Sequence, residues 1–84
     1  MRVEFMGIAR ERAGTAEVTF PAATLGQMLA MLSTRFPMLG DIVNGERLQP
    51  AFVANLNGDR FVSDPATPLV EDDSVLILSA DAGG

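Results

Sequence analysis

The sequence lacks three residue types that carry much of protein chemistry: cysteine, histidine and lysine. Without cysteine and histidine the chain has no thiolate nucleophile, no side chain that titrates near neutral pH and none of the common zinc ligands. It also has no G-x-S-x-G elbow, no G-x-x-x-x-G-K-[ST] phosphate loop and no G-x-G-x-x-G motif. We therefore expect no self-contained catalytic site, no metal and no cofactor bound by this chain.

Long apolar runs and excess basic charge are missing as well. Apolar runs such as Val75-Leu76-Ile77-Leu78 fall far short of the roughly 20 residues that cross a bilayer. The net charge of −5 argues against a nucleic acid partner, because such binding depends on clustered Lys and Arg. No apolar leader precedes Glu4, so we expect no membrane segment and a cytoplasmic location. The acidic surplus suits docking on a basic protein surface, although it more often serves solubility alone.

The pattern of apolar residues predicts one helix and several strands in a single domain of 84 residues. The helix is predicted over 25–35, because Thr24-Leu25-Gly26-Gln27 fits a capping box and Pro37 disfavours continuation. Residues 7–14 are expected to form a turn, and residues 37–50 a loop with one short helical turn around 41–43. Alternation of apolar and polar residues predicts strands over 1–8, 16–20, 52–56, 60–62 and 74–79.

This order of elements fits an α+β fold of the β-grasp (ubiquitin-like) type, a mixed sheet of about five strands with one main helix on one face. The first and last strands would lie parallel at the centre of the sheet, which accounts for apolar residues on both faces of 74–79. A ferredoxin-like fold would need a second helix, for which 37–50 is a poor candidate. We expect a β-grasp domain over 1–79 and a flexible tail over 80–84.

The chain ends in Ala80-Asp81-Ala82-Gly83-Gly84, which contains no large side chain. A tip without Cβ atoms can enter a narrow channel and present its α-carboxylate there. The same residues also fit a frayed terminus that ends in two glycines by chance, so the pair alone is weak evidence.

Four segments of the chain carry a family resemblance. The segment Phe5-Met6-Gly7-Ile8-Ala9-Arg10-Glu11-Arg12-Ala13-Gly14 is similar to an F-x-x-x-A-R-E-x-x-G opening. The other segments are Leu56-Asn57-Gly58, Pro68-Leu69 through Asp73-Ser74-Val75, and the terminal Gly83-Gly84. Together they resemble the small subunit of molybdopterin synthase, whose opening this is, and its relative, the thiamine-pathway sulfur carrier. The Leu78-Ser79-Ala80-Asp81 stretch departs from the aromatic residues and Pro-Pro pair that molybdopterin-type members often carry there.

The resemblance implies a sulfur carrier whose working group is the Gly84 carboxylate. A separate adenylating enzyme, using ATP and Mg, would convert this carboxylate to an acyl-adenylate, and a persulfide donor would then supply sulfur to form a thiocarboxylate. The tail residues Asp81, Ala82 and Gly83 would carry Gly84 to its partners. The acceptor would be a synthase such as the molybdopterin synthase large subunit, with this chain as its small sulfur-donating subunit. Because the residues before the tail depart from the molybdopterin-type pattern, the sequence does not choose among sulfur transfer to molybdopterin, thiamine, cysteine or tRNA.

Strand parity predicts a docking surface beside the tail. Alignment with the Gly-Gly end of ubiquitin-like proteins places Val75 and Ile77 toward the helix, and Leu76 and Leu78 on the open face of the sheet. There they would bind a partner, unless the loop at 37–50 or 62–70 covers them.

Two other functions fit the same sequence. In the first, the chain is a protein modifier that Gly84 attaches to a target lysine, and the lack of lysine forbids lysine-linked chains of the protein on itself. In the second, the chain is a passive interaction module whose Gly-Gly end is incidental. The lack of lysine and cysteine also leaves no side chain that could capture an acyl-adenylate. Chance depletion explains the lack of these two residue types equally well.

Overall fold

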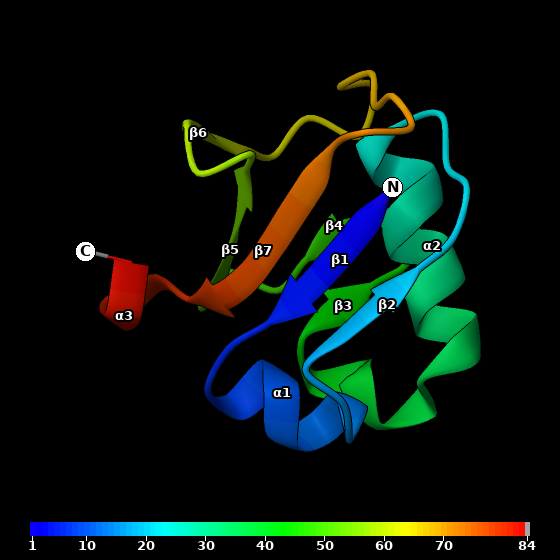
Figure 1. Cartoon of the computed structure of the whole chain (residues 1–84). Helices are drawn as coiled ribbons and strands as arrows, with labels where there is room; N and C mark the ends of the chain where they lie inside the picture. The colour runs from blue at the N-terminus through cyan, green and yellow to red at the C-terminus, as the bar shows by residue number, and fades with distance from the viewer. Residues whose placement is uncertain (84) are drawn as a thin grey trace.

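The computed structural model describes residues 1–83, which form a five-stranded sheet, a separate two-stranded sheet and several helices (Figure 1). In this part of the chain no helix is long and apolar enough to cross a membrane. The elements in chain order are β1 (Arg2–Phe5), α1 (Ile8–Ala13), β2 (Glu17–Thr19), α2 (Leu25–Arg35), the 3-10 helix η1 (Pro37–Asp41), β3 (Val43–Asn44), β4 (Arg47–Leu48), β5 (Phe52–Leu56), β6 (Arg60–Val62), β7 (Ser74–Ser79) and α3 (Ala80–Gly83).

The large sheet has the strand order β2-β1-β7-β5-β6. Its first and last strands, β1 and β7, lie parallel at the centre, with Arg2 opposite Ser74 and Phe5 opposite Ile77. The remaining neighbours pair in antiparallel fashion. The predicted α+β, β-grasp arrangement is therefore confirmed, and the central position of β7 explains its apolar residues on both faces.

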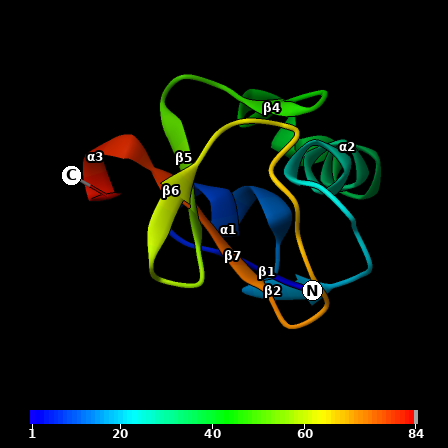
Figure 2. The ribbon, with the colours of Figure 1, turned by 90° about the horizontal axis from the view of Figure 1, so that it is seen from above.

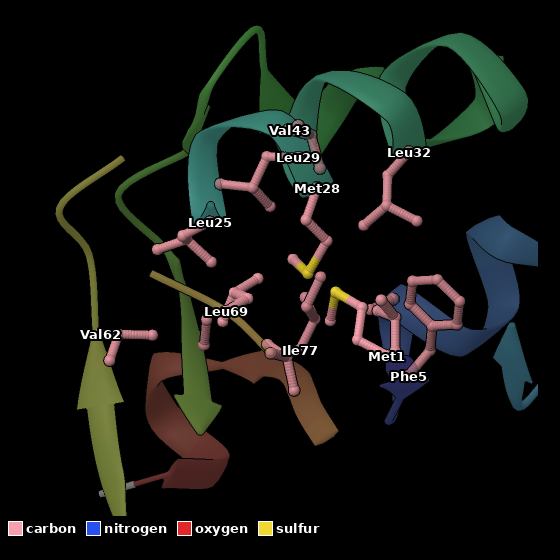
Figure 3. Packing of buried hydrophobic residues seen from close by; sticks show 14 of the residues in the cluster. Met1, Phe5, Leu25, Met28, Leu29, Leu32, Val43, Val62, Leu69 and Ile77 are labelled. Carbon is pink, nitrogen blue, oxygen red and sulfur yellow. The ribbon is translucent and has the colours of Figure 1, made fainter. Parts of the chain in front are cut away.

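Helix α2 covers one face of this sheet and closes the core. Figure 3 shows side chains of the helix pointing at those of the sheet, with Leu25, Met28 and Leu32 above Ile77 and Phe5. All five side chains are buried. Full burial of a side chain of this size contributes about 1.5–3 kcal/mol, so this layer supplies much of the stability of a small domain.

The start of α2 confirms the capping box with one adjustment. The Gln27 backbone N–H donates to Thr24 Oγ1 at 3.1 Å, as predicted. The returning bond comes from the Ala23 N–H to Gln27 Oε1 at 2.6 Å, one residue before the expected position. The cap thus fixes the first turn and the chain that enters it, and the helix ends at Arg35 before Pro37.

The predicted turn over residues 7–14 is wrong, because this segment contains α1. Gly7 and Gly14 bracket the helix with φ values of 62° and 76°, which glycine adopts without strain. Ala9 is fully buried, and α1 contacts η1, where Arg12 Nη1 lies 2.9 Å from Asp41 Oδ2. A six-residue helix therefore replaces an extended hairpin loop, and β1 ends at Phe5 rather than Ile8.

The segment 37–50 also has more structure than predicted. The helical turn lies at Pro37–Asp41, earlier than expected, and a short hairpin of β3 and β4 follows around Gly45, whose φ is 63°. Leu39, Ile42 and Val43 are buried against the α2 side of the core. The loop is ordered because it covers part of the helix.

Candidate functional site

Strand β7 positions the end of the chain. It is the central strand of the sheet, held by β1 on one side and β5 on the other, and it runs directly into α3. The Ala80 N–H donates to the Ala51 carbonyl at 2.8 Å, which fixes the point where the chain leaves the sheet. Figures 1 and 2 show α3 beyond the end of β7, on the side away from α2. The C-terminal residues therefore start from a rigid base.

The predicted tail divides into a described and an undescribed part. Residues Ala80–Gly83 form a single helical turn, in which Asp81 is exposed and Ala82 and Gly83 continue the backbone. Gly84, the predicted working residue, lies outside the described residues. The flexibility predicted for 80–84, and the roles of these residues, stay predictions.

The two faces of β7 differ as predicted. Val75 and Ile77 are fully buried in the core beneath α2, whereas Leu76 is half-buried and Leu78 lies outside that core cluster. Leu78 is nevertheless only 7% exposed, so the expectation that it is open to solvent is wrong. Its strand neighbour Val53, directly opposite on β5, lies on the same face, and α3 packs against both strands. The partner-binding role of the two leucines stays a prediction.

The surface of the large sheet that faces away from α2 is called the open face below. The apolar part of this face extends beyond Leu76 and Leu78, because it also includes Met6 and Phe61, which are 47% and 56% exposed. Strand register brings Phe61 opposite Asn55, and Asn55 opposite Leu76. By strand position the open face includes Arg2, Glu4, Met6, Glu17, Thr19, Val53, Asn55, Phe61, Ser74, Leu76 and Leu78.

The sequence prediction missed most of these residues. Phe61 alternates with the buried Val62, so strand parity identifies it once the sheet is known. Met6 was included in the first strand but not assigned to a surface. No local pattern marks Asn55, because its importance depends on its neighbours across the sheet.

One edge of the open face is polar and internally paired. Arg2 Nε lies 3.1 Å from Glu4 Oε1 and donates to Ser74 Oγ at 3.0 Å. These residues, with Asn55, Asn57, Gly58 and Leu76, line a shallow hollow of about 330 Å³. Neither in this hollow nor elsewhere in residues 1–83 do three Asp or Glu side chains lie close enough together to hold a metal ion.

Two segments of the family resemblance meet beside this hollow. The Asn57 side chain donates to Asp73 Oδ1 at 2.9 Å and accepts from the Ser74 N–H at 2.8 Å. Asn57 also has a positive φ of 57°, followed by Gly58 at 67°, the backbone of a tight hairpin. The bond from Asn57, with a second from the Val70 N–H, lowers the pKa of the Asp73 carboxyl below its ordinary value. These motifs thus hold β5 and β7 together rather than form a reactive site.

No family model and no curated protein matches the sequence, whereas several solved structures do. SAMP1 from Haloferax volcanii matches with a TM-score of 0.80 and 19% identity, over 99% of this chain and 97% of that one. The HVO 2177 protein of the same organism matches at 0.74 and 26% identity, over 99% and 84%. A chain of the BexX/CysO complex from Amycolatopsis orientalis matches at 0.77 and 24% identity, over 99% and 98%.

These likenesses cover nearly the whole chain and confirm the fold to which the sequence resemblance pointed. SAMP1 and CysO are small ubiquitin-like proteins of the sulfur-carrier and modifier kind. SAMP1 is named a small archaeal modifier protein, and CysO was solved in complex with BexX. At this level of identity the comparison establishes the fold, and function has to be argued from the chain itself.

Proposed function

We propose that the chain is a sulfur carrier that works through the carboxylate of Gly84. The observation that supports this most strongly is the path of β7, the central strand of a rigid sheet, directly into the small residues that lead to Gly83-Gly84. A rigid base beside an apolar surface lets a partner hold the domain while the chain end reaches its active site.

The chemistry follows from the reactivity of a carboxylate, which is a poor electrophile until one oxygen becomes a good leaving group. In an activating partner, a Gly84 oxygen attacks the α-phosphorus of ATP, and pyrophosphate leaves. A persulfide sulfur then attacks the acyl carbon, and AMP leaves. A thiol that cleaves the resulting acyl disulfide leaves the thiocarboxylate on Gly84. ATP and Mg belong to the activating partner in this scheme, and this chain is its substrate.

The second partner is an acceptor synthase that uses the thiocarboxylate as its sulfur nucleophile. A synthase of the molybdopterin type is our first choice, because the Phe5 to Gly14 segment has that type's pattern. Thiamine-type, cysteine-type and tRNA-type acceptors follow, since the residues before the tail depart from the molybdopterin pattern. We propose that the open face docks against these enzymes, with Leu76 and Phe61 in contact.

The tail provides the direct test of this proposal. Removal of Gly84, or replacement of Gly83 by Trp, should abolish ATP–pyrophosphate exchange by the adenylating enzyme of the same genome. Because these residues follow the last strand of the sheet in the sequence, the midpoint of thermal unfolding should stay within about 2 °C of the parent. An unchanged exchange rate in the truncated protein would refute the carrier function.

A second candidate is a protein modifier, which the names of the matched SAMP1 proteins favour. Here the activated Gly84 would form an amide with a lysine of another protein. An affinity-tagged chain expressed in its own cells should then yield conjugates that survive thiol treatment and contain Gly84 linked to lysine by mass spectrometry. A thiocarboxylated chain without such conjugates would leave the carrier as its function.

A further inference from the structure

One polar atom on the open face is buried without a partner. The Oδ1 atom of Asn55 is inaccessible to solvent, and no group in residues 1–83 donates a hydrogen bond to it. A buried acceptor left unpaired costs about 1–3 kcal/mol. Because nearly all buried polar groups in proteins are paired, this asparagine needs an explanation.

The neighbours of Asn55 show what could pair with it. In strand register Asn55 lies between Phe61 and Leu76, and Glu4 follows on the far side of Leu76. Across neighbouring strands, the row therefore consists of the exposed Phe61 ring, the Asn55 amide, the apolar Leu76 side chain and the Glu4 carboxylate. Arg2 is the one basic residue whose strand position places it on the described open face, and it is already paired with Glu4.

We propose that Asn55 is a specificity-determining residue of the open face, where it accepts a hydrogen bond from an arginine side chain of a docking protein. The inference rests on the proposed function, because it assumes that the open face binds a partner. The terminal side-chain torsion of asparagine is broad, so the amide can turn to exchange Oδ1 and Nδ2 and present Oδ1 to the hollow that Asn55 lines together with Glu4 and Leu76. The hollow, at about 330 Å³, has room for a guanidinium group and part of its stem.

Arginine suits this row better than the other donors. Its apolar stem can lie on Leu76 while the N–H groups of its planar head reach Asn55 in the hollow. The net charge of −5 favours a cation over a neutral donor. Lysine lacks the planar head, and a backbone amide lacks both the stem and the charge.

A titration of the isotope-labelled protein with short peptides tests this proposal without an activating enzyme. We expect acetyl-Leu-Arg-Leu-amide to shift the Asn55 side-chain amide and the Leu76 backbone amide in NMR spectra, with saturation. The peptide with norleucine in place of arginine keeps the stem but not the donor. It should bind about tenfold more weakly, as the loss of a hydrogen bond to a charged group requires.

Two variants separate recognition from stability. Asn55→Leu should abolish the preference for the arginine peptide and raise the midpoint of thermal unfolding, since it removes the unpaired acceptor. Asn44→Leu, at an exposed asparagine on the small sheet beside α2, should change neither. Equal binding of the arginine and norleucine peptides by the parent would overturn the proposal, and so would an unchanged arginine preference in Asn55→Leu. The peptide comparison needs no variant, and it can fail while thiocarboxylation succeeds, so the two proposals are tested separately.

Discussion

At the scale of single residues, Asp73 gives the fold a defined acid sensitivity. Its carboxylate accepts hydrogen bonds from Asn57 and Val70, which lower its pKa in the folded chain. A depressed folded pKa stabilises the fold above the unfolded value, near 3.9, and this contribution disappears as the pH falls through the folded value. We therefore expect thermal stability to fall below about pH 4.

The variant Asp73→Asn tests that assignment in melts between neutral and acidic pH. It should be less stable than the parent at pH 7 and should lose less stability on acidification. Asp72→Asn, at the exposed neighbouring residue, serves as the matched control and should keep the parent's pH profile. Parallel profiles for parent and Asp73→Asn would exclude Asp73 as the source.

The burial of Leu78 changes which residue best tests the open face. Leu78→Asp would place a charge in a site that is 7% exposed, so it should destabilise the fold by about 3 kcal/mol or more. Phe61→Asp changes a side chain that is 56% exposed and should leave thermal stability nearly unchanged. We expect Phe61→Asp to weaken binding to the activating enzyme by calorimetry, with circular dichroism to verify folding. Parent-like affinity in this variant would remove Phe61 from the docking surface.

At the scale of elements, the close approach of α2 to the loop before β7 constrains Gly26. The Gly26 N–H donates to the Pro65 carbonyl at 2.9 Å, and a Cβ atom at this position would lie 2.8 Å from the Pro65 Cβ. Although alanine favours helix by about 1 kcal/mol, Gly26→Ala should destabilise the protein by about 1–3 kcal/mol through this clash. Gly40→Ala meets no atom within 4 Å and should be close to neutral. Chemical denaturation measures the free energy of unfolding of both variants. A Gly26→Ala protein more stable than the parent would show that the Pro65 loop can move away from the helix at little cost.

The elements that were predicted from sequence are those with strong local patterns. The capping box and apolar stripe give α2 its observed bounds, and Asn57-Gly58 marks the hairpin between β5 and β6. Helix α1 was missed because its six residues are too few to show helical periodicity between two glycines. The β3–β4 hairpin was missed because each strand has two residues and is stabilised by contact with α2 rather than by its own alternation.

At the scale of the whole molecule, the parallel pairing of β1 and β7 links the fold to the proposed function. This pairing was predicted from the order of the elements and accounts for the apolar residues on both faces of residues 74–79, and it places the end of β7 at the centre of the sheet. The burial of Leu78 and the unpaired oxygen of Asn55 could not be predicted, because both depend on which side chains become neighbours across β5, β6 and β7. Strand parity assigns a face to a residue, but only packing determines its exposure.

The measurement that tests the central claim most directly is the intact mass of the protein after incubation with its adenylating enzyme, ATP, Mg and a persulfide donor. The account predicts a mass increase equal to one exchange of oxygen for sulfur, located at Gly84 by fragmentation and absent when Gly84 is deleted. An unchanged mass, with an enzyme that is shown to adenylate this chain and a donor that is active on another carrier, would contradict it.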